Sequence, residues 1–153
     1  MAETTPRKPY QQRDRRYVVE YCGEKWPNDT WFFNLRMGPA PISVAEKYPG
    51  MDVDRYARVW KKTSDAVVVT KDEIILIEGE LRRPTMALGE LLVYRDLINT
   101  TPELQPYLGR KLRTILLCPV EDPTITMQLR DHNVELALYK PAWVETYLKE
   151  VMK

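Results

Sequence analysis

The chain has 153 residues, with 23 Lys or Arg against 22 Asp or Glu, one His and two Cys. This length is typical of a single domain, and the one His and two Cys are too few for a structural zinc site. The longest apolar runs, such as 74–77 and 115–118, are far shorter than the ~20 residues that span a bilayer, so no membrane segment is expected.

Residues 1–12 combine Pro, Thr and basic side chains and are predicted to form a basic arm in front of one domain over residues 13–153. The domain opens with a predicted helix over 13–25, because apolar side chains recur there at helical spacing. A strand is predicted over 30–37. The segment that follows is irregular, with one short helix predicted over 53–61.

Two strands are then predicted over 65–70 and 73–80, since each contains a continuous apolar run typical of strands covered on both faces. Periodicity alone leaves a buried helix open. A helix over 85–99 follows, with Thr85 as its expected N-cap. The last predicted elements are a strand over 112–118, a helix over 123–131, a strand over 134–139 and a helix over 141–152. This order predicts an α/β fold with a mixed central sheet and helices on both faces.

Three acidic side chains gather at one end of the predicted hairpin. If its loop is centred on residues 71–72, the numbers of paired residues sum to 143, so Asp65 faces Glu78 with Cβ atoms roughly 5 Å apart. Glu80 then points to the same face as Glu78. A different register would separate the acids. Opposed like charges are destabilising, and Mg²⁺ or Mn²⁺ held by two carboxylates, water and a substrate phosphate would neutralise them; acids that merely face solvent at strand ends are the alternative.

Basic residues cluster on either side of these acids, and two of the clusters are candidate contacts to a nucleic-acid backbone because Lys and Arg neutralise phosphate charge. The candidates are Arg55, Arg58, Lys61, Lys62, Arg82 and Arg83. A further group comprises Arg110, Lys111 and Arg113. For each cluster, a solvated surface is the alternative interpretation.

Ser64-Asp65, the hairpin and Glu78-Gly79-Glu80 together resemble the motif of the PD-(D/E)XK nuclease superfamily, with Ser64 in place of its Pro. Glu90 and Tyr94 on the following helix are similar to the Gln-x-x-x-Tyr element of many such nucleases. The resemblance covers most of residues 13–140. It implies a single-domain restriction-endonuclease-like core of order αβββαβ, here extended by C-terminal α, β and α elements.

For the site, the resemblance implies that Asp65 and Glu78 hold Mg²⁺ or Mn²⁺, which activates water to attack a phosphodiester bond of DNA. The family's third catalytic position is usually Lys, whereas this chain has Glu80, which can act as a general base but supplies no positive charge. Further groups could take part at the site. Arg82 could bind phosphate if the strand continues that far, and Lys62 or Lys71 could approach from loops as a base. The first-helix acids Glu20 and Glu24 could supply a further carboxylate near the metal.

Two functional classes follow. The first is a Mg²⁺-dependent deoxyribonuclease of the cytoplasm. The second is an inactive nuclease fold with a structural role, such as the phage head-completion or head–tail connector proteins that small stand-alone members resemble; such a protein would be found in the virion. In the second class, the N-terminal arm would contact a homo-oligomer or a larger assembly. Both classes predict that the Asp65 and Glu78 carboxyl groups lie close enough to share one ion.

Overall fold

The computed structural model describes residues 9–40, 46–50, 52–53 and 62–153. The side chains of residues 9–12 are not among the described ones. The predicted short helix over 53–61 lies outside the described residues except for Val53.

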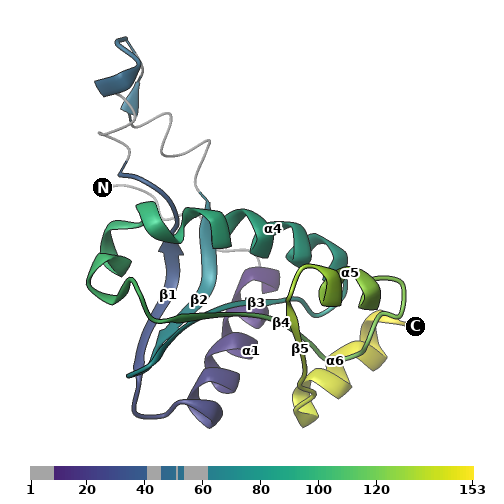
Figure 1. Ribbon diagram of the computed structural model, residues 1–153. Coiled ribbons are helices and arrows are strands. Elements are labelled where there is room, and N and C mark those ends of the chain that lie inside the picture. Colours follow the sequence, from purple (N-terminus) through teal and green to yellow (C-terminus); the bar gives the residue numbers. More distant parts are fainter. Residues whose placement is uncertain (1–8, 41–45, 51, 54–61) are drawn as a thin grey trace, which may run out of the picture.

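A five-stranded mixed sheet forms the centre of the molecule (Figure 1). The first three strands form an antiparallel meander, and the last two join it in parallel. The predicted mixed sheet is therefore confirmed, and both apolar runs of the hairpin are strands. In their order across the sheet, the strands are β1 (Thr30–Arg36), β2 (Thr63–Val69), β3 (Glu73–Gly79), β4 (Lys111–Cys118) and β5 (Glu135–Leu138).

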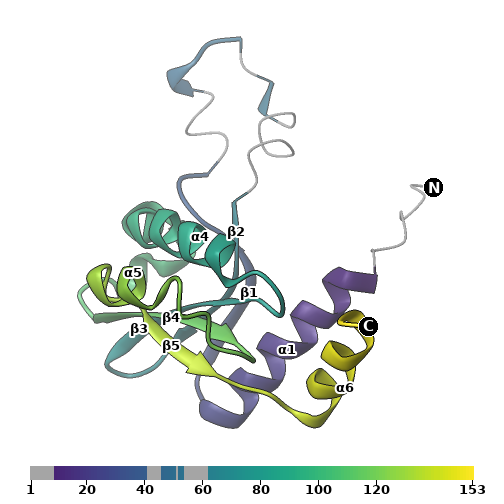
Figure 2. The same cartoon turned by 90° about the vertical axis from the view of Figure 1, so that its right-hand side faces the viewer.

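Helices cover both faces of the sheet, as predicted (Figure 2). One face carries the first and last helices, α1 (Pro9–Lys25) and α6 (Ala142–Val151). The other face carries α4 (Pro84–Leu97) and α5 (Thr126–Asp131). Two short 3-10 helices, η1 (Ile98–Thr100) and η2 (Pro102–Tyr107), connect α4 to β4. No helix in the described part of the chain is long and apolar enough to cross a membrane.

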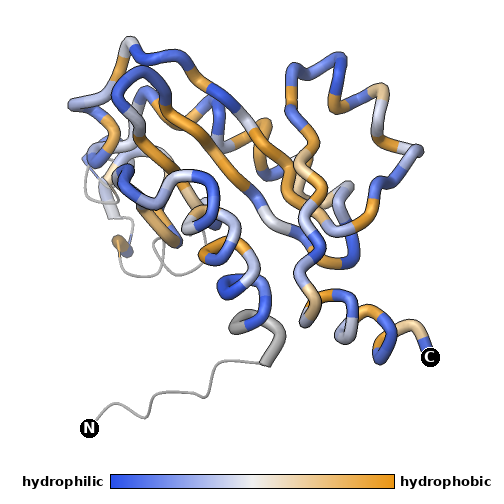
Figure 3. Tube along the Cα trace, turned by 90° about the horizontal axis from the view of Figure 1, so that it is seen from below, coloured by the Kyte–Doolittle hydropathy of each residue, from blue (hydrophilic) through white to orange (hydrophobic). Residues whose placement is uncertain are grey.

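Because both faces are covered, the middle strands are apolar on both sides, which gives them their continuous hydrophobic runs (Figure 3). Side chains alternate between the two faces along each strand. In β3, Ile74 and Leu76 pack into the core beneath α4, whereas Ile75 and Ile77 pack into the core beneath α1. The same alternation directs Glu78 towards the α4 side.

Two helix starts differ from the prediction. Helix α1 begins at Pro9, four residues before the expected start. Helix α4 begins at Pro84, its N-cap residue is Arg83, and no side chain caps it, so the prediction of Thr85 as N-cap is wrong. The physical reason is that proline lacks a backbone N–H and has a helical φ, which suits it to the first helical position.

The strand directions define two ends of the sheet, at which different loops meet. The β2–β3 turn and the start of β4 lie at one end, where Lys111 N–H donates to Asp72 O. The start of β2 and the carboxyl ends of β3 and β4 lie at the other end. Asp65 and Glu78 lie at this second end.

Candidate active site

The central feature is a pair of carboxyl groups on neighbouring strands, with Glu78 buried and Asp65 partly buried. Strands β2 and β3 pair from Ala66 with Ile77 onward, with residue numbers that sum to 143, so the predicted register is confirmed. The Asp65 N–H donates to Glu78 Oε1 at 2.9 Å, and the Gly79 N–H donates to Asp65 Oδ2 at 3.0 Å. Glu78 is only 2% exposed. The hairpin thus brings the two predicted metal ligands together, each with one oxygen bonded to the opposite strand.

Burial governs the ionisation of this pair. Desolvation, followed by the negative charge of Asp65, raises the pKa of Glu78 far above its usual range. Burial also raises the pKa of Asp65, although the hydrogen bonds from Gly79 and Glu78 oppose the shift. The negative charge of Asp65 beside Glu78 thus disfavours ionisation of both groups at once. The pair therefore retains a proton at a pH where exposed carboxyl groups are ionised, and a cation could take the place of that proton.

A third carboxyl group, Asp14 on α1, lies at the same centre. Burial, then the charges of Glu80 and Asp65, raises the pKa of Asp14 to about 7, while the charges of Arg82 and Arg13 lower it. Its Oδ1 atom is buried and has no hydrogen-bond partner among the described residues. A buried carboxylate oxygen without a donor is costly, and a bound cation would satisfy it.

The sequence contains a signal for Asp14 that the prediction missed. Asp14 precedes Val18 by four residues and so continues the buried stripe of α1 as a carboxylate among apolar side chains. The acids predicted on this helix, Glu20 and Glu24, instead bond the C-terminal segment. Glu20 accepts a hydrogen bond from the Trp143 indole at 2.6 Å, and Glu24 accepts one from the Tyr139 hydroxyl at 2.7 Å.

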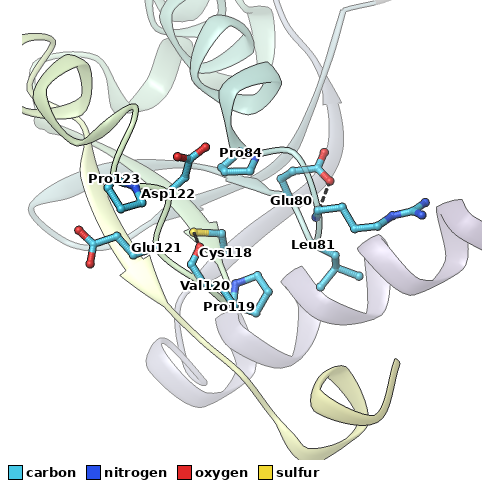
Figure 4. A pocket seen from close by; sticks show the side chains of 10 residues that line it. Glu80, Leu81, Pro84, Cys118, Pro119, Val120, Glu121, Asp122 and Pro123 are labelled. Carbon is cyan, nitrogen blue, oxygen red and sulfur yellow. Dashed lines mark hydrogen bonds between the residues drawn. The ribbon is translucent and has the colours of Figure 1, made fainter. Parts of the chain in front are cut away.

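Glu80 lies just beyond the end of β3. Its N–H donates to Leu117 O at 2.9 Å, and its Oε1 accepts the Arg82 N–H at 3.0 Å. Its charge raises the pKa of both Asp65 and Asp14. Glu80 also lines a pocket of about 270 Å³ at the carboxyl ends of β3 and β4, with Glu121 on the opposite side (Figure 4). Glu80 therefore has access both to the acidic residues and to an open pocket.

The two predicted residues of helix α4 also face the carboxyl pair. The exposed Glu90 raises the pKa of Asp65 and Glu78 through its charge. Tyr94 is buried, and desolvation followed by the charges of Glu78, Glu90 and Asp65 raises its pKa. The helix thus adds one negative charge and one phenol to the surroundings of the site. We define the acidic centre as Asp14, Asp65, Glu78, Glu80 and Glu90.

The predicted DNA-binding residues divide into three groups. Arg82 and Arg83 are exposed in the turn between β3 and α4. Because β3 ends at Gly79, Arg82 does not continue the strand, and its guanidinium instead lies over the Tyr147 ring, 6.0 Å from the centroid. Lys62 is exposed next to the start of β2, at the same end of the sheet as Asp65. The remaining three candidates, Arg55, Arg58 and Lys61, lie outside the described residues.

The other basic groups lie at the far end of the sheet. Arg113 forms ion pairs with Glu73 at 3.1 Å and with Glu135 at 2.9 Å, which join three neighbouring strands. Lys71 lies in the β2–β3 turn, about 20 Å along the hairpin from Glu78, because it faces Asp72 and six residues at ~3.4 Å each separate Asp72 from Glu78. Lys71 is therefore too far away to assist at the acidic centre, and the Arg110–Arg113 cluster does not flank it.

The donor set suits a hard divalent cation. Among the described residues, no three His, Cys, Asp or Glu side chains already form a group that could hold a metal ion. Mg²⁺, however, is commonly held by one or two carboxylates, with water and substrate phosphate as the other ligands. The Asp65–Glu78 pair provides two carboxylates, and the unbonded oxygen of Asp14 indicates a further need for positive charge.

Comparison with known proteins supports the fold. No protein-family model and no curated protein matches the chain. Among solved structures, the chain is similar to a repair endonuclease from Pyrococcus abyssi, with a TM-score of 0.52 and 15% sequence identity. The match covers 92% of this chain and 50% of the endonuclease, so the chain spans about half the length of that protein. The molecule thus has an endonuclease-like α/β fold.

Proposed function

We propose that this protein is a metal-dependent nuclease that hydrolyses phosphodiester bonds of DNA at the acidic centre. The observation that carries the proposal is the pair of buried Glu78 and partly buried Asp65, in which desolvation and mutual repulsion favour uptake of positive charge. A fold similar to that of a repair endonuclease supports the proposal. The sequence resemblance adds support, because it implies metal ligation by these same two residues.

Each residue has a distinct role in the proposed reaction. Asp65 and Glu78 hold Mg²⁺ or Mn²⁺, which would supply activation of water and neutralisation of charge on the phosphate. Asp14 contributes a third negative charge to the same centre. Glu80, at the mouth of the pocket, is the candidate general base because a carboxylate can accept a proton from water. Arg82, Arg83 and Lys62 contact backbone phosphates.

The test is cleavage of plasmid DNA in the presence of Mg²⁺ or Mn²⁺. We expect nicked or linear product from the unchanged protein, and a loss of at least about 100-fold in rate for Asp65→Asn and Glu78→Gln, since each removes a metal ligand. Glu80→Gln should lower the rate but leave DNA affinity unchanged. Glu103→Gln, an exposed acid on η2, is the matched control and should cleave normally.

One observation favours the second candidate function, an inactive nuclease fold with an assembly role: Glu80 stands where the resembled family usually has Lys. If neither metal supports cleavage and the protein instead assembles into a ring or larger particle in solution, the assembly role is correct and the nuclease proposal is wrong. Cleavage that survives in both Asp65→Asn and Glu78→Gln would also refute the site, because it would come from other residues or from a contaminant.

A further inference from the structure

Helix α1 and the C-terminal helix α6 lie side by side, and arginine–aromatic pairs join them (Figure 2). The Arg13 guanidinium lies 4.7 Å from the centroid of the Tyr147 ring, and the Arg16 guanidinium lies 4.4 Å from that of Trp143. Residue numbers rise along α1 as they fall along α6, so the two helices run antiparallel where they touch. Both contacts are within the range of cation–π attraction.

The two pairs differ in their surroundings. Arg16 forms an ion pair with Glu20 at 2.7 Å, and the Trp143 indole donates to the same carboxylate at 2.6 Å. The Arg16 charge is therefore neutralised by Glu20, and this cluster of three side chains joins the two helices. Arg13 instead acts on Asp14, whose pKa its charge lowers. Arg13 also directly precedes Asp14 in α1, so it neighbours an acid of the acidic centre.

A second arginine reaches the same tyrosine from a distant part of the chain. Arg82, in the turn between β3 and α4, lies 6.0 Å from the Tyr147 ring centroid. Its charge, like that of Arg13, lowers the pKa of Asp14. The Arg82 N–H donates to Glu80 Oε1 at 3.0 Å, so both Arg13 and Arg82 neighbour acids of the acidic centre. Tyr147 is 5% exposed, so packing sets the position of its ring. Stacking on an aromatic ring orients a guanidinium, whose planar set of five N–H donors matches phosphate oxygens.

We propose that Tyr147 is a positioning residue that holds Arg13 and Arg82 beside the acidic centre, where the two guanidinium groups bind phosphates of the DNA strand. The inference rests on the proposed function. It explains how a site with Glu80 in place of the family's Lys attracts a polyanion: the positive charge comes from two segments joined by the C-terminal helix, which lies outside the αβββαβ core.

The test measures affinity for a fluorescently labelled DNA duplex over a series of KCl concentrations in the full-length protein. All variants carry Asp65→Asn, so the DNA stays intact. Tyr147→Leu should weaken binding about tenfold at moderate salt and reduce the slope of log affinity against log salt by about two, because two phosphate contacts are lost. Tyr147→Phe keeps the ring and should bind as the parent does.

The matched control is Trp143→Leu, which removes the equivalent ring over Arg16 and should leave the slope unchanged. Equal losses in Trp143→Leu and Tyr147→Leu would overturn the proposal, because the effect would then come from helix packing. An unchanged slope in Tyr147→Leu would overturn it as well. Far-UV circular dichroism and thermal melting check that each variant folds.

Single variants keep the proposal testable if Tyr147→Leu does not fold. Arg13→Gln and Arg82→Gln should each reduce the salt slope by about one, and unchanged slopes in both would refute the role of the pair. Failure of the proposed function is recognised separately, because it appears as absence of plasmid cleavage by the protein without Asp65→Asn. An unchanged salt slope in Tyr147→Leu, in contrast, contradicts the positioning role of Tyr147 and leaves the proposed nuclease function intact.

Discussion

At the scale of single residues, Glu78 shows how the site departs from an ordinary strand end. Its carboxyl group is almost fully buried, and burial together with the charge of Asp65 raises its pKa. A folded-state pKa above the unfolded value means that the native state binds a proton that the unfolded state releases. The contribution of this group to stability is therefore fully present below about pH 4, the usual pKa of Glu, and is lost as the pH rises towards the folded-state pKa.

Glu78→Gln tests this account of ionisation. The amide cannot ionise, so in the absence of divalent metal the variant should be more stable than the parent by at least about 1 kcal/mol near pH 8, with a much smaller difference near pH 5. Chemical denaturation at a series of pH values measures the difference. Glu103→Gln should change stability by less than about 0.5 kcal/mol at every pH. A variant less stable than the parent at pH 8 would contradict the burial argument.

At the scale of secondary structure, helix α1 packs so closely on β3 that the residue between Glu78 and Glu80 must be small. A Cβ atom added at Gly79 would lie 2.5 Å from Val18 Cγ2 and 3.4 Å from Tyr17 Cδ1. In the sequence, Gly79 lies between Glu78 and Glu80 in the segment that resembles the nuclease motif. The structure shows that its small size lets the first helix pack directly on the strand that carries the site.

Gly79→Ala should therefore destabilise the protein by about 1–3 kcal/mol, because the added methyl group must displace Val18 in a packed core. Denaturant unfolding measures the loss. Gly89→Ala on α4 is the matched control: its Cβ would meet no atom within 4 Å, and alanine favours a helix by up to about 1 kcal/mol relative to glycine. Equal stability of Gly79→Ala and the parent would show that α1 can shift freely.

At the scale of the whole molecule, charge is divided between the two ends of the sheet. The acidic centre occupies the end where β3 and β4 finish, whereas Arg113 and its partners Glu73 and Glu135 form a balanced ionic network at the other end. The near-neutral overall composition conceals this division. The first end combines the carboxyl groups of the acidic centre, a pocket and two exposed arginines.

This division predicts the response of the whole protein to metal. Mg²⁺ that binds the native acidic centre should raise the melting temperature, since a ligand at 100 times its dissociation constant stabilises by about 2.7 kcal/mol, or roughly 5–11 °C at this chain length. The shift should be larger near pH 8 than near pH 6, because protons compete for carboxyl groups with raised pKa values. Differential scanning fluorimetry measures both. Asp65→Asn should abolish the shift; a shift that persists would place the ion elsewhere.

Much of the fold could be read from local sequence patterns. Apolar runs in β2, β3 and β4 predict buried strands because a strand covered on both faces has no polar side. Helix ends were less predictable, as the start of α4 at Pro84 shows, since several nearby residues can begin a helix. Whether β3 extends as far as Arg82 was likewise left open, because local pattern does not define where a strand ends, and the strand ends at Gly79.

By itself, the sequence determined that β2 and β3 are adjacent strands joined by a short hairpin, and it predicted that Asp65 faces Glu78 if the turn is centred on residues 71–72; the structure confirms that register. Tertiary structure alone decided that Asp14, Arg13 and Tyr147 join this pair. These residues come from the two ends of the chain, and their approach depends on how α1 and α6 pack on one face of the sheet. Helical periodicity shows which side of a helix is buried, but it does not show which distant element that side meets.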